Sequence, residues 1–338
     1  MGSNLNGQTT DQSNFQHAVV RPQNELFSDM DLPLRRTFYP LGFAVELFTN
    51  DPEVFHAADD SFGHRRLRHG SAALQIRIGV TGSGNTECPP EPTRREYDHL
   101  YSLVADVENQ ALLDLRTSTN FVWLNASALK SRLYFRHNFL EKVVYLLLGA
   151  SVVTDLHAGC VSKNGKGILL CGDSGAGKTT LSYACARAGW TYTSDDTSYL
   201  INRSIVPRVI GHAHRVRFRP AAKELFPELE RREITPRMEG KASIEVPMSE
   251  LPTIDAATEA TVSSIVYLNR HPGAKAALTP LPERTATERM CKELYSAGEI
   301  RTKHEKVLEI LASIPTFELQ YCELDQAIEK LALLTDSV

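Results

Sequence analysis

The stretch "GILLCGDSGAGKTTLSYACARAG", residues 167–189, constrains the fold more than any other part of this chain. Four apolar residues precede Gly172, as in a short buried strand. After the glycine-rich part, apolar side chains recur with the spacing of one helix face, at Leu181, Ala184, Cys185 and Ala188. Gly189 then ends this pattern. The sequence therefore predicts a strand, a glycine-rich loop and a helix in direct succession.

The residues of the loop follow the spacing Gly-x-x-x-x-Gly-Lys-Thr, which favours phosphate binding. Backbone N–H groups and the helix N-terminus point at a bound phosphate, Lys178 reaches its outer oxygens, and the Thr179 hydroxyl suits Mg²⁺. Asp173 and Ser174 either contact the ligand or only shape the loop. A glycine-rich turn with a solvated lysine is the alternative, and the strand–loop–helix context disfavours it. We expect ATP with Mg²⁺ to bind to Gly172, Asp173, Ser174, Gly175, Ala176, Gly177, Lys178, Thr179 and Thr180.

Two adjacent carboxylates follow the next predicted strand, "WTYTS" at residues 190–194. A carboxylate at a strand end beside a phosphate loop suits a metal ligand or a catalytic base. Asp195 and Asp196 can divide these roles, because successive side chains of an extended chain point in different directions. The sequence Asp-Asp-Thr-Ser is also typical of a simple turn. The upstream loop favours the functional interpretation.

A histidine precedes the loop by fifteen residues. His157 lies in "VTDLHAGCV", residues 153–161, and "SKNGKG", residues 162–167, predicts a tight turn between two strands. Such a hairpin would bring His157 back beside the exit of the loop.

These elements together resemble the catalytic core of the HPr kinase/phosphorylase family. The resemblance rests on His157, the stretch GDSGAGKT at 172–179 and the pair Asp195-Asp196, and it covers residues 152–200. The nucleotide fold of that family is similar to that of phosphoenolpyruvate carboxykinase. The resemblance implies phosphoryl transfer from a nucleotide to a serine hydroxyl. It also implies that Asp195 is the base, assisted by His157, and that Asp196 and Thr179 lie near Mg²⁺, with Lys178 on the phosphates.

The chain departs from this family after the aspartate pair. The phosphorylase members carry a second signature, Glu-x-Arg-Gly-x-Gly, where this chain reads "VIGHAHRVRFRPAAKELF" at 209–226. We therefore predict a kinase that lacks the reverse, phosphate-removing activity. The N-terminal part does not resemble that of the bifunctional enzyme, so we expect an acceptor other than HPr.

Alternate arginines follow in the same segment. Arg215, Arg217 and Arg219 would share one face of a strand, since alternate residues do. They suit either an anionic ligand or a solvated edge, and the sequence leaves both open. Lys241 and Glu245 are predicted to lie on the surface rather than in the site.

The fold class predicted for the whole chain is α/β (α+β). Residues 151–338 would form a P-loop kinase domain with a mixed sheet, 33–150 a smaller α+β module, and 1–32 a disordered tail. In the module we expect a loop at 81–96, a helix at 131–148 and strands at 41–49, 73–80, 99–107, 111–119 and 120–125.

Composition excludes several classes of partner. The 338 residues are 42% hydrophobic and 23% charged with a net charge of −4, which gives no global attraction to nucleic acid or to a membrane surface. The most apolar run, residues 143–153, is too short for a membrane span. Six cysteines without metal spacing favour reduced thiols in the cytoplasm. The family resemblance is compatible with a homo-oligomer.

The sequence therefore predicts an ATP- and Mg²⁺-dependent kinase that acts on a hydroxyl, a serine of a peptide or protein. A nucleotide-binding regulatory module without transfer activity is the first alternative, and a kinase of a small metabolite is the second. Asp195 and His157 favour an enzyme over a regulatory module. The sequence does not separate peptide from metabolite acceptors.

Overall fold

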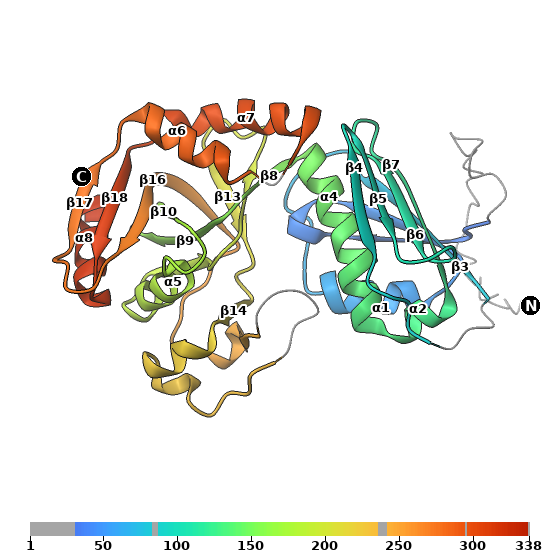
Figure 1. Ribbon diagram of the computed structural model, residues 1–338, viewed down its shortest axis with the longest axis horizontal. Coiled ribbons are helices and arrows are strands. Elements are labelled where there is room, and N and C mark those ends of the chain that lie inside the picture. The colour runs from blue at the N-terminus through green and yellow to red at the C-terminus, as the bar shows by residue number, and fades with distance from the viewer. Residues whose placement is uncertain (1–30, 83–86, 236–241, 295, 337–338) are drawn as a thin grey trace, which may run out of the picture. The chain divides into compact units, whose positions relative to one another are not determined.

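The structure is a computed structural model that describes residues 31–82, 87–235, 242–294 and 296–336. The tail predicted at 1–32 lies, apart from its last two residues, outside the described part of the chain. From Leu32 onward the chain forms one compact unit. It has a mixed α/β fold with two large mixed sheets and one small ribbon, which confirms the predicted fold class (Figure 1). The predicted boundary near residue 150 stays a prediction.

The first sheet has seven strands in the order β1-β2-β3-β7-β6-β5-β4. These are β1 Leu34–Phe38, β2 Val45–Thr49, β3 Leu74–Thr81, β4 Thr93–Tyr97, β5 Leu100–Val104, β6 Gln110–Asp114 and β7 Thr119–Asn125. Strand β3 pairs parallel with β2 and β7, and the other pairs are antiparallel. The prediction of a loop over 81–96 is wrong at the end of this range, because β4 begins at Thr93. All side chains of β4 are exposed, so no apolar alternation marks this strand in the sequence.

Helices cover this first sheet. Helix α1 spans Glu53–Phe62, directly after Pro52. The helix predicted at 131–148 is instead a series: α2 Ala126–Lys130, α3 Arg132–Phe135, a π-helical turn Arg136–Glu141 and α4 Lys142–Ser151. The series begins earlier than predicted because the Asn125 side chain accepts hydrogen bonds from the N–H groups of Ser127 (3.1 Å) and Ala128 (3.2 Å). Ser131, with ψ 77°, separates α2 from α3.

The second sheet has nine strands around the long central strand β16. They are β8 Val153–Leu156, β9 Ala158–Lys163, β10 Lys166–Cys171, β11 Thr191–Ser194, β12 Ser198–Ile201, β13 Arg208–Gly211, β16 Glu259–Arg270, β17 Ala277–Pro280 and β18 Thr316–Tyr321. Seven of them follow the order β11-β9-β10-β16-β13-β12-β8, and β18 pairs with both β16 and β17. Strand β16 is parallel to β10 and β18 and antiparallel to β13. The sheet is therefore mixed, as predicted.

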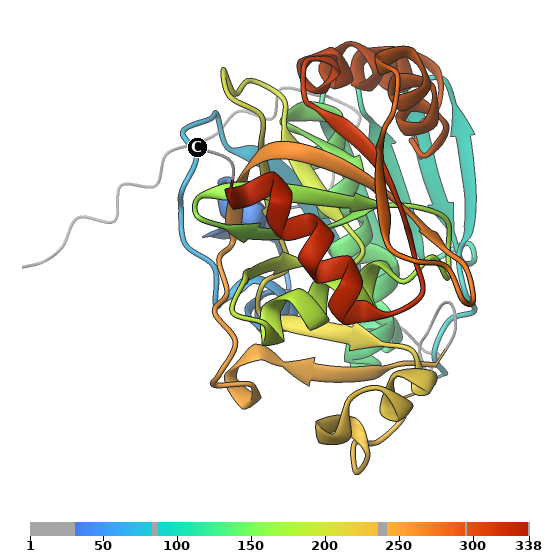
Figure 2. The ribbon, with the colours of Figure 1, turned by 90° about the vertical axis from the view of Figure 1, so that its left-hand side faces the viewer.

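Strand β10 is buried on both faces, which explains its continuous apolar run. Ile168 and Leu170 contribute to the core shared with α5, Lys178–Arg187, and α8, Leu324–Asp336. Leu169 and Cys171 contribute to the core shared with α6, Glu283–Lys292, and α7, Gly298–Ala312. Figures 1 and 2 show these helix pairs on opposite faces of the sheet. The loop after β10 therefore starts from the middle layer of the fold.

A two-stranded ribbon, β14 Arg215–Phe218 and β15 Ile244–Pro247, lies beside α5. Val216 and Phe218 of β14 share a core cluster with Tyr183 of α5. Short 3-10 turns flank the strands of the fold at Pro40–Gly42, Pro220–Glu224, Pro227–Leu229 and Met248–Glu250. Among the described residues, no helix has the length and apolar character needed to cross a membrane.

Candidate functional site

The glycine-rich loop closes around the ammonium group of Lys178. The chain leaves β10 at Gly172, and Lys178 is the first residue of α5. Its Nζ donates to the carbonyl oxygens of Gly172 (2.7 Å) and Asp173 (3.3 Å), and only 3% of its side chain is exposed. The lysine charge therefore lies on the inner side of the loop, where a phosphate-binding loop needs it.

The end of the loop is held from another strand. Gly177 has φ 100°, and a Cβ there would meet the hydroxyl oxygen of Tyr321 at 2.6 Å. Tyr321, the last residue of β18, donates this hydroxyl to the carbonyl oxygen of Ala176 (3.2 Å). No sequence motif marks Tyr321, because its strand lies far along the chain. Asp173, Ser174 and Gly175 are exposed on the loop, and Thr179 and Thr180 are half-buried in the first turn of α5.

The aspartate pair lies in the turn between β11 and β12. The hydroxyl groups of Ser194 and Ser198 lie 2.6 Å apart, and Ser198 donates to the carbonyl oxygen of Ala158 (2.9 Å). Gly159 faces this turn so closely that a Cβ there would lie 2.9 Å from the carbonyl oxygen of Asp195. These contacts fix the turn against the start of β9.

Asp196 connects the loop to the histidine. Its Oδ1 accepts a hydrogen bond from Nε2 of His157 (3.1 Å) and lies 3.5 Å from Nζ of Lys178. Burial acts to raise the pKa of Asp196, but the His157 hydrogen bond and the Lys178 charge outweigh it, so the pKa lies below its ordinary value. With 57% of its side chain exposed, Asp196 is an ionised carboxylate open to a ligand.

Asp195 has a different environment. Its Oδ2 accepts a hydrogen bond from the backbone N–H of Arg217 (2.9 Å), the third residue of β14. Burial raises the pKa of Asp195, the Arg217 N–H group partly offsets this, and the neighbouring Asp196 charge raises it further. One carboxyl group is thus held ionised while its neighbour has a raised proton affinity, as in sites that divide acid and base roles.

The structure places His157 beside the loop, as predicted. Asn164 and Gly165, with φ 52° and 76°, form the turn between β9 and β10, and the two strands pair so that Ala158 lies opposite Cys171. The partner of the imidazole differs from the one that the resemblance implied. His157 contacts Asp196, not Asp195, because the Asp195 side chain turns toward β14.

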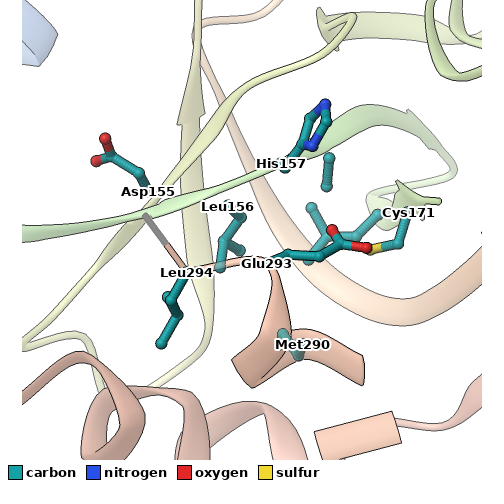
Figure 3. A pocket seen from close by; sticks show the side chains of 9 residues that line it. Asp155, Leu156, His157, Cys171, Met290, Glu293 and Leu294 are labelled. Carbon is teal, nitrogen blue, oxygen red and sulfur yellow. The ribbon is translucent and has the colours of Figure 1, made fainter. Parts of the chain in front are cut away.

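A small cavity of about 10 Å³, room for roughly one water, adjoins His157. Glu293, just after α6, lines it together with Cys171, and Figure 3 shows both side chains below the imidazole. Burial raises the pKa of Glu293, and the charges of His157 and Lys178 partly offset this. Sequence reasoning missed Glu293, since no motif surrounds it in the sequence.

Two of the three arginines that were predicted to share a strand face form salt bridges with a glutamate of this chain. Arg215 Nη1 lies 3.2 Å from Glu245 Oε2, and Arg217 Nε lies 2.9 Å from Glu245 Oε1. Glu245, predicted as a surface residue, therefore bridges two of the three arginines from β15. Arg219 lies beyond β14 and is exposed. Lys241 lies outside the described residues.

A larger cavity, about 470 Å³, lies along the C-terminal half of α5 and the start of α8. Leu225 and Ile328 contribute apolar surface to it, Arg187 and Arg270 contribute positive charge, and Glu323 and Asp325 contribute negative charge. Arg270 is the last residue of β16. Two residues earlier, the carbonyl oxygen of Leu268 lies close to Gly172, because a Cβ at Gly172 would be 3.3 Å from it. Arg270 therefore lies near the start of the loop. The volume of the cavity is in the range of small-ligand sites.

No protein-family model matches this sequence, and no curated protein matches it. Among solved structures, the Hpr(Ser) kinase/phosphatase from Coxiella burnetii is similar to this chain at a TM-score of 0.31 and 11% sequence identity. The likeness covers 53% of this chain and 96% of that one.

Proposed function

We propose that this chain is a Mg²⁺-dependent phosphotransferase that binds ATP at the loop and transfers its γ-phosphoryl group to a hydroxyl group. One observation carries the proposal. Lys178 and His157 both contact the same oxygen of Asp196, at 3.5 Å and 3.1 Å, so the loop, the aspartate pair and the histidine meet at one point. Such a site combines phosphate binding, a metal-binding carboxylate and a candidate base, the parts that phosphoryl transfer requires.

The residues present fit Mg²⁺. Asp196 offers an ionised, exposed carboxylate, and Thr179, next to the loop lysine, offers a hydroxyl oxygen. Mg²⁺ prefers oxygen ligands of this kind, supplied by one or two protein groups together with phosphate oxygens and water. When bound, the ion would neutralise negative charge on the phosphates. Lys178 would contribute its fixed positive charge to the same oxygens.

The chemical step needs little covalent help from the protein. The acceptor hydroxyl oxygen forms a bond to the γ-phosphorus, the bond from that phosphorus to the β–γ bridging oxygen breaks, and the hydroxyl proton passes to Asp195. The raised pKa of Asp195 increases its affinity for this proton. His157 acts as a positioning residue, since it holds Asp196 through the 3.1 Å hydrogen bond.

The nucleoside of the donor would occupy the 470 Å³ cavity beside α5. Arg270 connects this cavity to the loop region, and the exposed Leu225 side chain offers an apolar surface to a base. For the acceptor we propose a serine of a peptide or protein, as the family resemblance implies. A nucleotide-binding module without transfer activity and a small-metabolite kinase are the alternatives that the experiment must separate.

The test uses γ-labelled ATP, Mg²⁺ and fractions of a cell lysate, divided by size into protein and small molecules. We expect label in one fraction with the parent chain and none with Asp195→Asn. Label in the protein fraction supports the serine kinase, and label in the small-molecule fraction supports the metabolite kinase. Tight ATP binding without label in either fraction would leave the regulatory module as the function.

A further inference from the structure

Basic side chains from two distant parts of the sequence meet beside the aspartate pair. Arg65, which follows α1, directs Nη2 to the Nδ1 atoms of His212 (3.2 Å) and His214 (3.3 Å). The rings of His64 and His214 lie 4.7 Å apart. We define the Arg65 cluster by its members, which are His64, Arg65, His212, His214, Arg215 and Arg217.

The Arg65 cluster has more positive than negative charge. Glu245 is the one carboxylate that pairs with both Arg215 and Arg217. Within the described ranges, no carboxylate forms a salt bridge with Arg65. Glu141, whose charge also acts on Arg215, already pairs with Arg136 at 3.1 Å. Three guanidinium groups thus share one dedicated carboxylate.

The histidines do not add to this charge at neutral pH, but they orient Arg65. Burial and the Arg65 charge lower the pKa of His214 to about 3 and the pKa of His212 well below its ordinary value. Both imidazoles are therefore neutral and use Nδ1 to accept from Arg65. Burial also lowers the pKa of Arg65, a sign that its charge is partly removed from water. A partly buried guanidinium without an anionic partner is costly, so a role in binding an anion explains it.

Strand β14, which carries Arg215 and Arg217 of the cluster, also contacts the proposed base. The backbone N–H of Arg217 donates to Asp195, and the Tyr192 hydroxyl donates to the carbonyl oxygen of Arg215 (3.1 Å). Arg215 lies two residues before Arg217 on this strand, a span of about 7 Å in an extended chain. A compound whose hydroxyl group lies at Asp195 would therefore have the Arg215 and Arg217 side of the Arg65 cluster within reach of a second group of its own.

We infer that the Arg65 cluster binds an oxyanion of the phosphoryl acceptor, a phosphate or carboxylate group separate from the hydroxyl that reacts. This inference rests on the proposed phosphotransferase function and specifies its acceptor. Arg65 supplies the planar fork that suits such anions. Because Arg65 precedes the second sheet by some ninety residues, the N-terminal part of the chain takes part in choosing the acceptor.

The test follows the imidazole signals of ¹³C-histidine-labelled protein by NMR at a fixed neutral pH. Lys178→Ala serves as the background, so that the loop lysine does not compete for the added anion. Inorganic phosphate forms one arm and succinate the other. We expect at least one anion to shift the His64 and His214 signals in a saturable way. Shifts with phosphate alone, succinate alone or both define the acceptor group, and no shift with either overturns the inference.

Two matched variants make the test specific. Arg65→Gln should weaken anion binding by about tenfold or more, because it removes a charge-assisted contact. Arg284→Gln, a change at an exposed side chain of α6, should leave it unaltered. If Arg65→Gln does not fold, Arg65→Lys should still weaken binding several-fold, because the fork is lost. Unchanged affinity in the folded Arg65 variant overturns the inference.

ATP binding is measured separately on the parent chain. ATP binding without histidine shifts would overturn the anion subsite but not the proposed function. Histidine shifts without ATP binding would overturn the proposed function, and with it the role of the anion as part of an acceptor.

Discussion

Nζ of Lys178 lies 3.5 Å from Oδ1 of Asp196, although the lysine side chain is buried and the aspartate side chain is exposed. The lysine side chain is 3% exposed, whereas the aspartate side chain is 57% exposed. The buried charge is fixed by two loop carbonyl oxygens, and the exposed one is fixed by His157. An arriving phosphate would approach Lys178 from the side of Asp196, where the carboxylate repels it unless a cation lies between them. This relationship gives a physical reason for the Mg²⁺ requirement that we propose.

Lys178→Ala should weaken ATP binding by about tenfold or more. The change removes a charge-assisted phosphate contact, which is worth about 1.5–3 kcal/mol. Calorimetry with ATP and Mg²⁺ measures the affinity, and Lys306→Ala, at an exposed residue of α7, is the control that should not differ from the parent chain. Equal affinity in Lys178→Ala and the parent chain would mean that ATP does not use this loop.

The two aspartates should respond differently to the same change. Asp195→Asn should abolish transfer and leave ATP affinity nearly intact, because the amide keeps the shape but cannot accept the hydroxyl proton. Asp196→Asn should weaken the Mg²⁺-dependent part of ATP binding, because a charged ligand is lost. Transfer assays and calorimetry at several Mg²⁺ concentrations separate the two effects. Full transfer in Asp195→Asn would contradict its assignment as base.

Sequence patterns predicted those parts of the candidate site whose positions depend on local chain geometry. The turn at Asn164-Gly165 and the strand–loop–helix order place His157 beside the loop, because each depends on a few neighbouring residues. The patterns could not show that His157 pairs with Asp196, since that depends on where the Arg217 N–H group lies. Tyr321 and Glu293 were missed for the same reason. Each reaches the site through the arrangement of the second sheet, which no short spacing encodes.

The fold was likewise predictable where local patterns are strong and not where strand pairing determines the structure. The buried run of β10 and the helix face of α5 are strong local signals, and both elements are found. Strand β4 is exposed along its length and β17 nearly so, and neither was predicted. Their position comes from pairing with β5 and β18, which supply the backbone partners that these strands need.

Gly159→Ala should reduce transfer more than ATP binding. The added Cβ would meet the Ser182 hydroxyl at 2.5 Å and the carbonyl oxygen of Asp195 at 2.9 Å. The hydroxyl can rotate away, but the backbone of Asp195 must shift, and displacement of a catalytic group by an ångström can cost about a hundredfold in rate. Steady-state kinetics should show a fall in kcat at nearly constant ATP affinity. Gly70→Ala, where an added Cβ meets nothing within 4 Å, is the matched control.

Asp155 should make the protein less stable as the pH rises. Its Oδ1 is buried and has no hydrogen-bond partner among the described residues, and burial raises its pKa to about 7. Figure 3 shows its carboxyl group on the β8 strand near the small cavity. Because the folded pKa exceeds the unfolded one, the unfolded chain loses the proton first, and the free energy of unfolding falls between about pH 4 and pH 7.

Asp155→Asn should remove this part of the pH dependence. The gain in the free energy of unfolding at pH 8 should be up to roughly 4 kcal/mol, the full effect of such a shift. Urea unfolding at pH 5 and pH 8 measures it, with the exposed Glu329→Gln as control. A parent chain that is equally stable at both pH values, or a variant with the parent's pH dependence, would show that Asp155 is not a buried acid.

The protein should not catalyse the reverse reaction, in which inorganic phosphate removes the phosphoryl group of the product. The forward reaction needs a loop, a metal and a base, and residues 157–196 bring Lys178, Asp196 and Asp195 together. The reverse reaction also needs inorganic phosphate held against the phosphorylated acceptor. The segment that would carry the phosphorylase signature forms β13 and β14 here, and the anion site inferred beside it is assigned to the acceptor's own group, not to inorganic phosphate. Labelled acceptor incubated with phosphate and Mg²⁺ should therefore release no pyrophosphate, while ADP added in place of phosphate should still return label to ATP. That second arm shows that the site is active, because it reverses the same transfer. Pyrophosphate release at a rate comparable to the forward reaction would mean that a phosphate site exists without the signature, and the Arg65 cluster would then be the place to seek it.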